Sequence, residues 1–244
     1  GSDRLAAIDL LDIENPKDVT YRELDGNCDA LARGLVRRGL GVGDRIAILS
    51  ENRVEFIEVL FGALRAGCVP VPINIKLAND TVRIILEDAE VKHVFTDSSR
   101  KSWPVDNLPH TDFDDDYSAF IDPGQFNAVD VSVNQVSMQL YTAGTTGRPK
   151  GVFYSHRATW LHAHAVVSTL GMTMADTALM LTPMVLADSV LAAVTLSRVF
   201  ADHMVIQQEQ PIRLFGSADP GEKLTAKLAG KTATATTGGT RSSS

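Results

Sequence analysis

A stretch rich in glycine and threonine lies between two apolar segments, in the sequence LYTAGTTGRPKGVFYSHRAT at residues 140–159. Glycines let backbone N–H groups approach an anion closely, threonine hydroxyls are further donors, and a lysine brings positive charge to the rim. The stretch therefore has the composition of a phosphate-binding loop. The residues that carry this interpretation are Gly144, Thr145, Thr146, Gly147, Lys150 and Gly151.

The spacing of this loop differs from that of the Walker phosphate loop. Gly147 and Lys150 are three residues apart, and no serine or threonine follows the lysine. A loop of glycine and threonine is also compatible with a tight turn that binds nothing. Arg148 and Lys150 favour an anion site, and the residues alone leave both interpretations open.

Strand and helix patterns alternate through the first part of the chain. Thr20 and Glu23 have the spacing of a capping box, and they open an amphipathic helix that we expect to stop at Gly39 and Gly41. Strands separated by helices predict a parallel sheet with helices on both faces. We expect strands at 44–50, 68–73 and 92–97, and further helices at 54–67 and 79–90, the latter capped by Asn79 or Asp80.

The pattern becomes irregular between residues 98 and 134, where we expect a loop with one helical turn. Its aspartates, Asp112, Asp114, Asp115 and Asp116, could ligate a hard cation, but no glycine or glutamate follows at EF-hand spacing, so a solvated acidic loop is favoured. Strands are expected again at 136–142 and 151–155, and a helix at 157–170. Together these elements predict one parallel α/β sheet over residues 20 to about 193.

Composition limits the classes of partner. The 244 residues are 44% hydrophobic and 22% charged, which is typical of a soluble globular protein with a sizeable core in one large domain or two small ones. A net charge of −7 disfavours binding to nucleic acid or to an anionic membrane, and we expect neither partner. Cys28 and Cys68 lie in apolar-patterned segments without metal-ligand spacing, so we expect them to be buried in a protein of the reducing cytoplasm.

The sequence YTAGTTGRPKG at residues 141–151 resembles the phosphate-binding signature of the adenylate-forming superfamily, Y-T-S-G-T-T-G-x-P-K-G. That superfamily includes acyl-CoA synthetases, nonribosomal adenylation domains and luciferases. The preceding sequence, from Thr20 through the P-x-x-x-x-L turn at Pro72 to Leu77, also resembles the N-terminal part of these enzymes. The resemblance covers residues 20 to about 193.

The resemblance implies an activity and a set of binding residues. Members of the superfamily use ATP and Mg²⁺ to convert a carboxylate into an acyl-adenylate, and most then transfer the acyl group to coenzyme A. One position differs, because Ala143 stands where the signature has serine. By analogy with the signature, the β- and γ-phosphates of ATP are expected to contact Thr142, Gly144, Thr145, Thr146, Gly147 and Lys150.

The resemblance also suggests an acyl pocket. His156 stands where the superfamily often has a histidine after the loop, and Val185 and Leu186 occupy a segment that lines the acyl pocket in other members. His162 and His164 are two residues apart on a predicted helix and have no carboxylate beside them, so we expect no metal site there.

After about Val194 the superfamily pattern ends in this sequence, and we expect a truncated or chimeric ligase that is inactive alone. Residues 198–237 are similar to the N-terminal β-domain of sialate O-acetylesterases, with strands at 210–216 and 223–237 around a turn. We expect an N-terminal segment with a cloning scar at 1–19, the ligase part at 20–195, a β-rich tail at 196–237 and a vector-derived linker at 238–244.

Two other functions stay open. The fold could bind a nucleotide phosphate or an acyl group without turnover, or it could be a self-associating structural fragment. An uncovered sheet edge would favour a homo-oligomer in either case.

Overall fold

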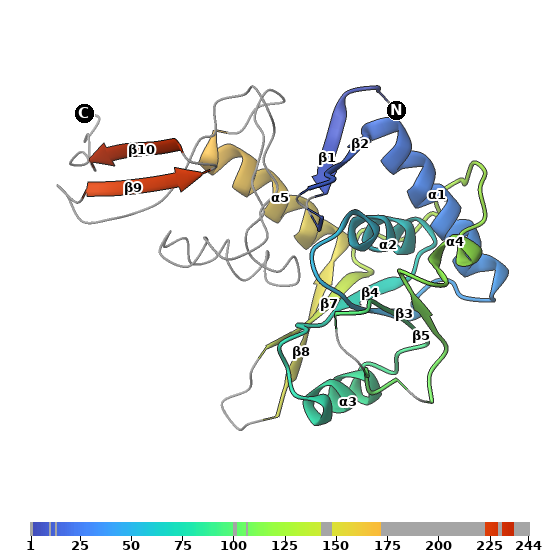
Figure 1. Ribbon diagram of the computed structural model, residues 1–244. Coiled ribbons are helices and arrows are strands. Elements are labelled where there is room, and N and C mark those ends of the chain that lie inside the picture. Colours follow the sequence, from blue (N-terminus) through green and yellow to red (C-terminus); the bar gives the residue numbers. More distant parts are fainter. Residues whose placement is uncertain are drawn as a thin grey trace.

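A computed structural model of the chain describes residues 2–9, 11–12, 14–99, 102–105, 107–142, 148–171, 223–228 and 231–236 (Figure 1). Among these residues, no helix has both the length and the apolar character that crossing a membrane requires.

The chain opens with a hairpin that leads into a capped helix. Strands β1 (Leu5–Asp9) and β2 (Lys17–Thr20) pair in antiparallel fashion, which the sequence patterns did not predict. Helix α1 (Tyr21–Arg37) follows directly, and the predicted capping box is confirmed. The Thr20 hydroxyl accepts a hydrogen bond from the Glu23 amide at 3.2 Å, and the Glu23 carboxylate accepts one from the Thr20 amide at 2.8 Å. Both free amides are thereby satisfied at the helix start.

A four-stranded sheet forms the centre of the fold, in the order β4-β3-β5-β6. Its strands are β3 (Arg45–Leu49), β4 (Val69–Pro72), β5 (His93–Thr96) and β6 (His110–Asp112). Every neighbouring pair is parallel, so the predicted parallel sheet is confirmed for this part of the chain.

Helices cover both faces of the sheet, as predicted, and successive strand residues alternate between the two cores. On one face, Ile46 and Ile48 of β3 pack with side chains of α1 and α2 (Val54–Arg65). On the other face, Ala47 and Leu49 pack with α3 (Asn79–Asp88). Figure 1 shows α1 and α2 on one side of these strands and α3 on the other.

Two local details differ from the expectations. The N-cap of α3 is Ala78, without a side-chain cap hydrogen bond, and Asn79 is already helical, so neither Asn79 nor Asp80 is the cap. The backbone turn between Asn74 and Leu77 brings the chain into the helix one residue before the first capping side chain. The predicted single helical turn in the 98–134 segment is present as α4 (Tyr117–Phe120).

The acidic run of this segment is largely exposed, as expected of a solvated loop. Asp114 nevertheless forms an ion pair with Arg53, with 2.8 Å between the carboxylate oxygen and Nη1. The short strand β6 was missed, because three residues are too few to show an alternating pattern.

The strands after residue 135 do not continue the parallel sheet. β7 (Val136–Thr142) and β8 (Lys150–Ser155) form a separate antiparallel pair, so the prediction of one parallel sheet through to residue 193 is wrong here. Helix α5 (His156–Leu170) follows, capped by the Ser155 hydroxyl, and ends before Gly171 in a left-handed conformation.

A third antiparallel pair lies in the C-terminal region. β9 (Lys223–Leu228) pairs with β10 (Lys231–Thr236), so the hairpin is formed within the segment that we expected to be one strand. Only Ala229 and Gly230 separate the strands, and a two-residue connection containing glycine favours a hairpin. The expected partner strand at 210–216 lies outside the described residues.

Candidate functional site

The β7–β8 hairpin brings two of the predicted phosphate-binding residues together. Thr142 ends β7 and Lys150 begins β8, and the two residues are direct partners across the antiparallel ladder. Both are exposed. A hydroxyl donor and an ammonium group therefore lie side by side at the end of the hairpin where residues 143–149 connect the two strands. This end is called the open end of the hairpin. Gly144, Thr145, Thr146 and Gly147, like Ala143, lie outside the described residues.

The next ladder pair towards the base of the hairpin consists of Tyr141 and Gly151. The Tyr141 hydroxyl donates to the Asp88 carboxylate of α3 at 2.7 Å, and the Gln139 side-chain amide donates to the Tyr141 hydroxyl oxygen at 2.8 Å. Partial burial and the bond to Asp88 raise the pKa of Tyr141 above its usual range. The phenol therefore stays protonated and keeps its donor for Asp88.

The opposite end of the hairpin joins α5. The Ser137 hydroxyl donates a hydrogen bond to the Tyr154 carbonyl oxygen at 3.1 Å, and it is hydrogen-bonded to the Thr159 hydroxyl of α5 at 2.8 Å. The Ser155 hydroxyl accepts a hydrogen bond from the Ala158 amide at 3.1 Å. These contacts fix the start of the helix at His156.

His156 is therefore at the far end of β8 from Lys150. His156 follows Lys150 by six positions along an extended strand, which corresponds to about 20 Å. The structure does not bring His156 to the end of the hairpin where Thr142 and Lys150 lie. Val185 and Leu186, the other two residues of the expected acyl pocket, lie outside the described residues.

The chemistry available at the open end of the hairpin is anion binding. Lys150 is a compact, mobile charge with three donors, and Thr142 adds a hydroxyl that can rotate towards an oxygen atom. Neither group is a good general base at neutral pH, but both can stabilise negative charge on a phosphate group. No group of three His, Cys, Asp or Glu side chains in the described part of the chain could hold a metal ion.

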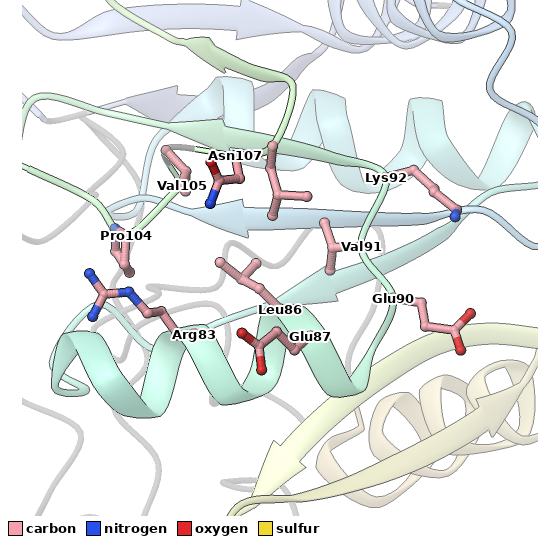
Figure 2. Close-up of a pocket in the computed structure, with 10 residues that line it drawn as sticks. Arg83, Leu86, Glu87, Glu90, Val91, Lys92, Pro104, Val105 and Asn107 are labelled. Atoms are coloured by element: carbon pink, nitrogen blue, oxygen red, sulfur yellow. The ribbon is translucent and has the colours of Figure 1, made fainter.

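A separate pocket of about 320 Å³ lies between α3 and the segment around residues 104–108 (Figure 2). Its apolar wall includes Leu86 and Val91, and charged side chains of both signs surround it, among them Glu87 and Lys92. Neither Thr142 nor Lys150 lines this pocket. It is therefore distinct from the end of the hairpin where Thr142 and Lys150 lie.

Two residues of the hairpin site were not found from the sequence. Gln139 could have been found, because Ser137, Gln139 and Tyr141 place polar groups at every second position of an otherwise apolar strand. Asp88 gave no such signal. It lies 53 residues before Tyr141 in the chain, and only the fold brings the two together.

The AMP-binding enzyme family matches residues 1–213, a wider range than the motifs at 20–193. Over 205 residues the chain is 31% identical to the medium-chain-fatty-acid–CoA ligase of Ectopseudomonas oleovorans, covering 73% of this chain and 38% of that protein. It is 29% identical over 160 residues to the 3-hydroxybenzoate–CoA/4-hydroxybenzoate–CoA ligase of Thauera aromatica, covering 58% of this chain and 30% of that protein. The chain thus spans less than half the length of these curated relatives.

Solved structures give the same result. O-succinylbenzoate coenzyme A synthetase of Bacillus subtilis, in complex with its acyl-adenylate intermediate, matches 69% of this chain and 44% of its own, with a TM-score of 0.63 and 27% identity. The same enzyme in complex with ATP and magnesium matches 78% of this chain and 50% of its own, with a TM-score of 0.65 and 24% identity. With a family match over most of its length and this shared fold, the chain belongs to the AMP-binding enzyme family.

Proposed function

We propose that the chain binds ATP in the AMP-forming activation of a carboxylic acid, with the β7–β8 hairpin holding the β- and γ-phosphates. The observation that carries this proposal is the pairing of Thr142 with Lys150 across the end of the ladder, both exposed, in a chain of the AMP-binding family. ATP and magnesium are bound in a solved relative, which supports the same ligands here.

The proposed reaction explains why these side chains are suited to the site. A carboxylate oxygen attacks the α-phosphorus of ATP, the bond from that phosphorus to the bridging oxygen breaks, and pyrophosphate leaves. Negative charge increases on the departing phosphates as the bond breaks. The Lys150 ammonium and the Thr142 hydroxyl stabilise that charge. Mg²⁺ enters with ATP and neutralises further phosphate charge when it is bound.

The relatives suggest the classes of acid and acceptor. A fatty or aromatic acid is the substrate we propose, because relatives named as ligases of both kinds match this chain. Coenzyme A is the proposed acceptor, whose thiol attacks the acyl carbon of the adenylate and releases AMP. His156, Val185 and Leu186 are the residues we propose for the acyl pocket.

A second candidate function is phosphate binding without turnover. Ala143 favours it, because the signature serine would supply a hydroxyl that alanine lacks. A hydrogen bond to a charged phosphate contributes about 1.5–3 kcal/mol, so its loss weakens the grip on the leaving group. An Ala143→Ser variant that gains pyrophosphate release relative to the parent chain would support this candidate.

Calorimetric titration tests the binding function directly. The 244-residue chain is titrated with pyrophosphate–Mg²⁺ and with ATP–Mg²⁺, beside Lys150→Ala and the matched control Lys76→Ala. Lys76 is an exposed lysine outside the hairpin. We expect Lys150→Ala to weaken binding by about tenfold or more, since a charged hydrogen bond of this size is lost, and Lys76→Ala to bind as the parent does.

Turnover is measured separately as pyrophosphate release with a panel of fatty and aromatic acids. Release that depends on both the acid and Lys150 supports the ligase function, and binding without release supports the second candidate. A parent chain that binds neither ATP–Mg²⁺ nor pyrophosphate–Mg²⁺ would refute both.

A further inference from the structure

The β7–β8 hairpin is attached to the rest of the fold by side chains. Its strands form a two-stranded sheet of their own, and within the described residues neither is hydrogen-bonded to the four-stranded sheet. An isolated pair of strands is marginally stable, so side-chain contacts must fix its orientation. At the base of the hairpin Ser137 contacts Thr159 of α5, and towards the open end Tyr141 contacts Asp88 of α3.

The contact near the open end has a defined hydrogen-bond direction. The Asp88 carboxylate only accepts, so the Tyr141 hydroxyl must donate to it. The hydroxyl oxygen is then free to accept from the Gln139 amide. Gln139 is 2% exposed, and its carbonyl oxygen has no partner in the described part of the chain, so the bond to Tyr141 is what pairs this buried side chain. Removing the hydroxyl leaves it unpaired, which is unfavourable.

The ladder partner of Tyr141 leaves room for this arrangement. A Cβ atom at Gly151 would lie 2.9 Å from Gln139 Nε2 and 3.2 Å from Tyr141 Cζ. The first distance is shorter than side chains tolerate, so any larger residue at position 151 would displace the amide or the ring. The glycine that ends the phosphate-loop signature therefore has a packing role in addition to its place beside Lys150.

The position of Asp88 is not explained by the stability of its own helix. It is the last residue of α3, where a negative charge is unfavourable because it faces the negative end of the helix dipole. It is also exposed, so it fills no space in the core. The bond to Tyr141 gives this carboxylate a role that neither charge nor packing provides.

We propose that Asp88, Tyr141 and Gln139 are positioning residues for phosphate binding. Resting on the proposed function above, the inference is that their hydrogen-bond chain holds the open end of the hairpin against α3. Thr142 and Lys150, which adjoin Tyr141 and Gly151 on the two strands, are thereby held in one arrangement before the nucleotide binds. A binding site that is ordered in advance loses less conformational freedom on binding, so these hydrogen bonds raise the affinity for phosphate.

Two pairs of variants separate this role from a general effect on the fold. Tyr141→Phe removes the hydroxyl that links Asp88 and Gln139. Tyr154→Phe makes the same change on the neighbouring strand and leaves the hydrogen bond to Asp88 intact. Asp88→Asn keeps an acceptor oxygen but removes the charge, and Glu87→Gln neutralises the adjacent exposed carboxylate. Each is titrated with pyrophosphate–Mg²⁺ at a temperature where melting curves show it to be folded.

We expect Tyr141→Phe to weaken pyrophosphate binding by about five- to tenfold, within the range of coupling between linked sites, and Asp88→Asn to weaken it less. Tyr154→Phe and Glu87→Gln should bind like the parent. Without ligand, backbone amides of 136–142 and 150–155 should exchange hydrogen faster in Tyr141→Phe than in Tyr154→Phe, because the hairpin opens more often.

The outcomes distinguish the two proposals. If the parent chain does not bind pyrophosphate–Mg²⁺, the proposed function fails and this inference fails with it. If the parent binds and Tyr141→Phe binds equally well, only the positioning role is overturned. A lower melting temperature with unchanged affinity and unchanged hairpin exchange also overturns it, because that pattern indicates a purely structural hydroxyl.

Discussion

We predict that the folded chain loses stability on acidification because of the buried imidazole of His93. The side chain is 5% exposed, and its Nε2 atom lies 2.9 Å from the Thr111 hydroxyl, to which it is bonded. Its ring centroid lies 5.0 Å from those of Phe95 and Phe120, and the Arg38 guanidinium stacks on the Phe120 ring. Burial first, and then the nearby charges of Arg38 and His110, lower the pKa of His93 to about 4.

The sign of the effect follows from that direction. The pKa is lower in the folded chain than in the unfolded chain, where it takes its ordinary value of 6.5. Between these values the unfolded chain binds more protons, so stability is complete above pH 6.5 and is lost as the pH falls towards about 4. At about 1.4 kcal/mol per pH unit, the whole interval corresponds to about 3 kcal/mol.

Urea unfolding at a series of pH values measures this loss. His93→Gln keeps a group that can bond to Thr111 but does not titrate, and His110→Gln changes the neighbouring exposed histidine as a matched control. Between about pH 7 and about pH 4.5, we expect the unfolding free energy of the parent to fall by about 2.5 kcal/mol more than that of His93→Gln. Carboxylates titrate in both proteins, so their contribution cancels in the difference.

Two results would refute this reasoning. Parallel pH curves for the parent and His93→Gln would show that His93 does not gain its proton on unfolding. An equal flattening of the curve in His110→Gln would show that the effect belongs to the exposed histidine. Either result would mean that the buried ring is better solvated than its contacts indicate.

Three further predictions concern packing and association. Burial raises the pKa of Glu58, which is 2% exposed, so stability should fall as the pH rises above its ordinary 4.5, and Glu58→Gln should abolish that fall in melting curves. Gly62→Ala should destabilise the fold by about 1–3 kcal/mol, because its Cβ would lie 2.8 Å from a carbonyl oxygen of α1. Gly26→Ala should stabilise the fold by about 0.5–1 kcal/mol, because a Cβ there would meet no atom of another element within 4 Å. Urea unfolding measures both changes. We also predict that the chain self-associates through Phe153 and Trp160, which are 57% and 60% exposed, and that Trp160→Glu gives a lower mass in light scattering; a monomeric parent contradicts this.

The elements of the central sheet could be predicted because their signals are local. The capping box at Thr20 and the apolar runs of β3 and β4 depend on residues that are close in sequence. The burial of Cys28 and Cys68 followed from the same periodicity, and it is confirmed. In these segments local propensity and the final fold agree.

The features that were missed depend on pairing or on backbone geometry. The β1–β2 hairpin and the antiparallel pairing of β7 with β8 are choices between strand partners, which alternation within one strand does not encode. The start of α3 at Ala78 is set by a preceding backbone turn. The sequence contains glycine both between residues 216 and 223 and at Gly230, and strand alternation alone did not show that the turn of the β9–β10 hairpin falls between Leu228 and Lys231.

The hairpin site divides in the same way. Thr142 and Lys150 were identified through the signature, because the residues of one phosphate-binding loop are close in sequence. Asp88, which accepts the hydrogen bond of Tyr141, is distant in sequence and showed no pattern. A motif therefore located the groups that we propose to contact the ligand, and only the fold showed the hydrogen bonds beside them.

Apart from that of Tyr141, the large pKa shifts in the described part of the chain belong to side chains of the packed cores, although shifted pKa values often mark functional sites. Burial raises the pKa of Cys28 and Cys68 to about 12 and lowers that of His93 to about 4, and all three side chains lie inside the packed cores. Acid–base catalysis needs a group whose charge can change near neutral pH, and burial moves the pKa of each of these three side chains away from neutral. Binding a phosphate needs a donor or a cation that stays accessible, which is the state of Thr142 and Lys150. In this fold most of the large pKa shifts thus affect stability, whereas the groups that we propose to bind phosphate lie at an exposed hairpin end.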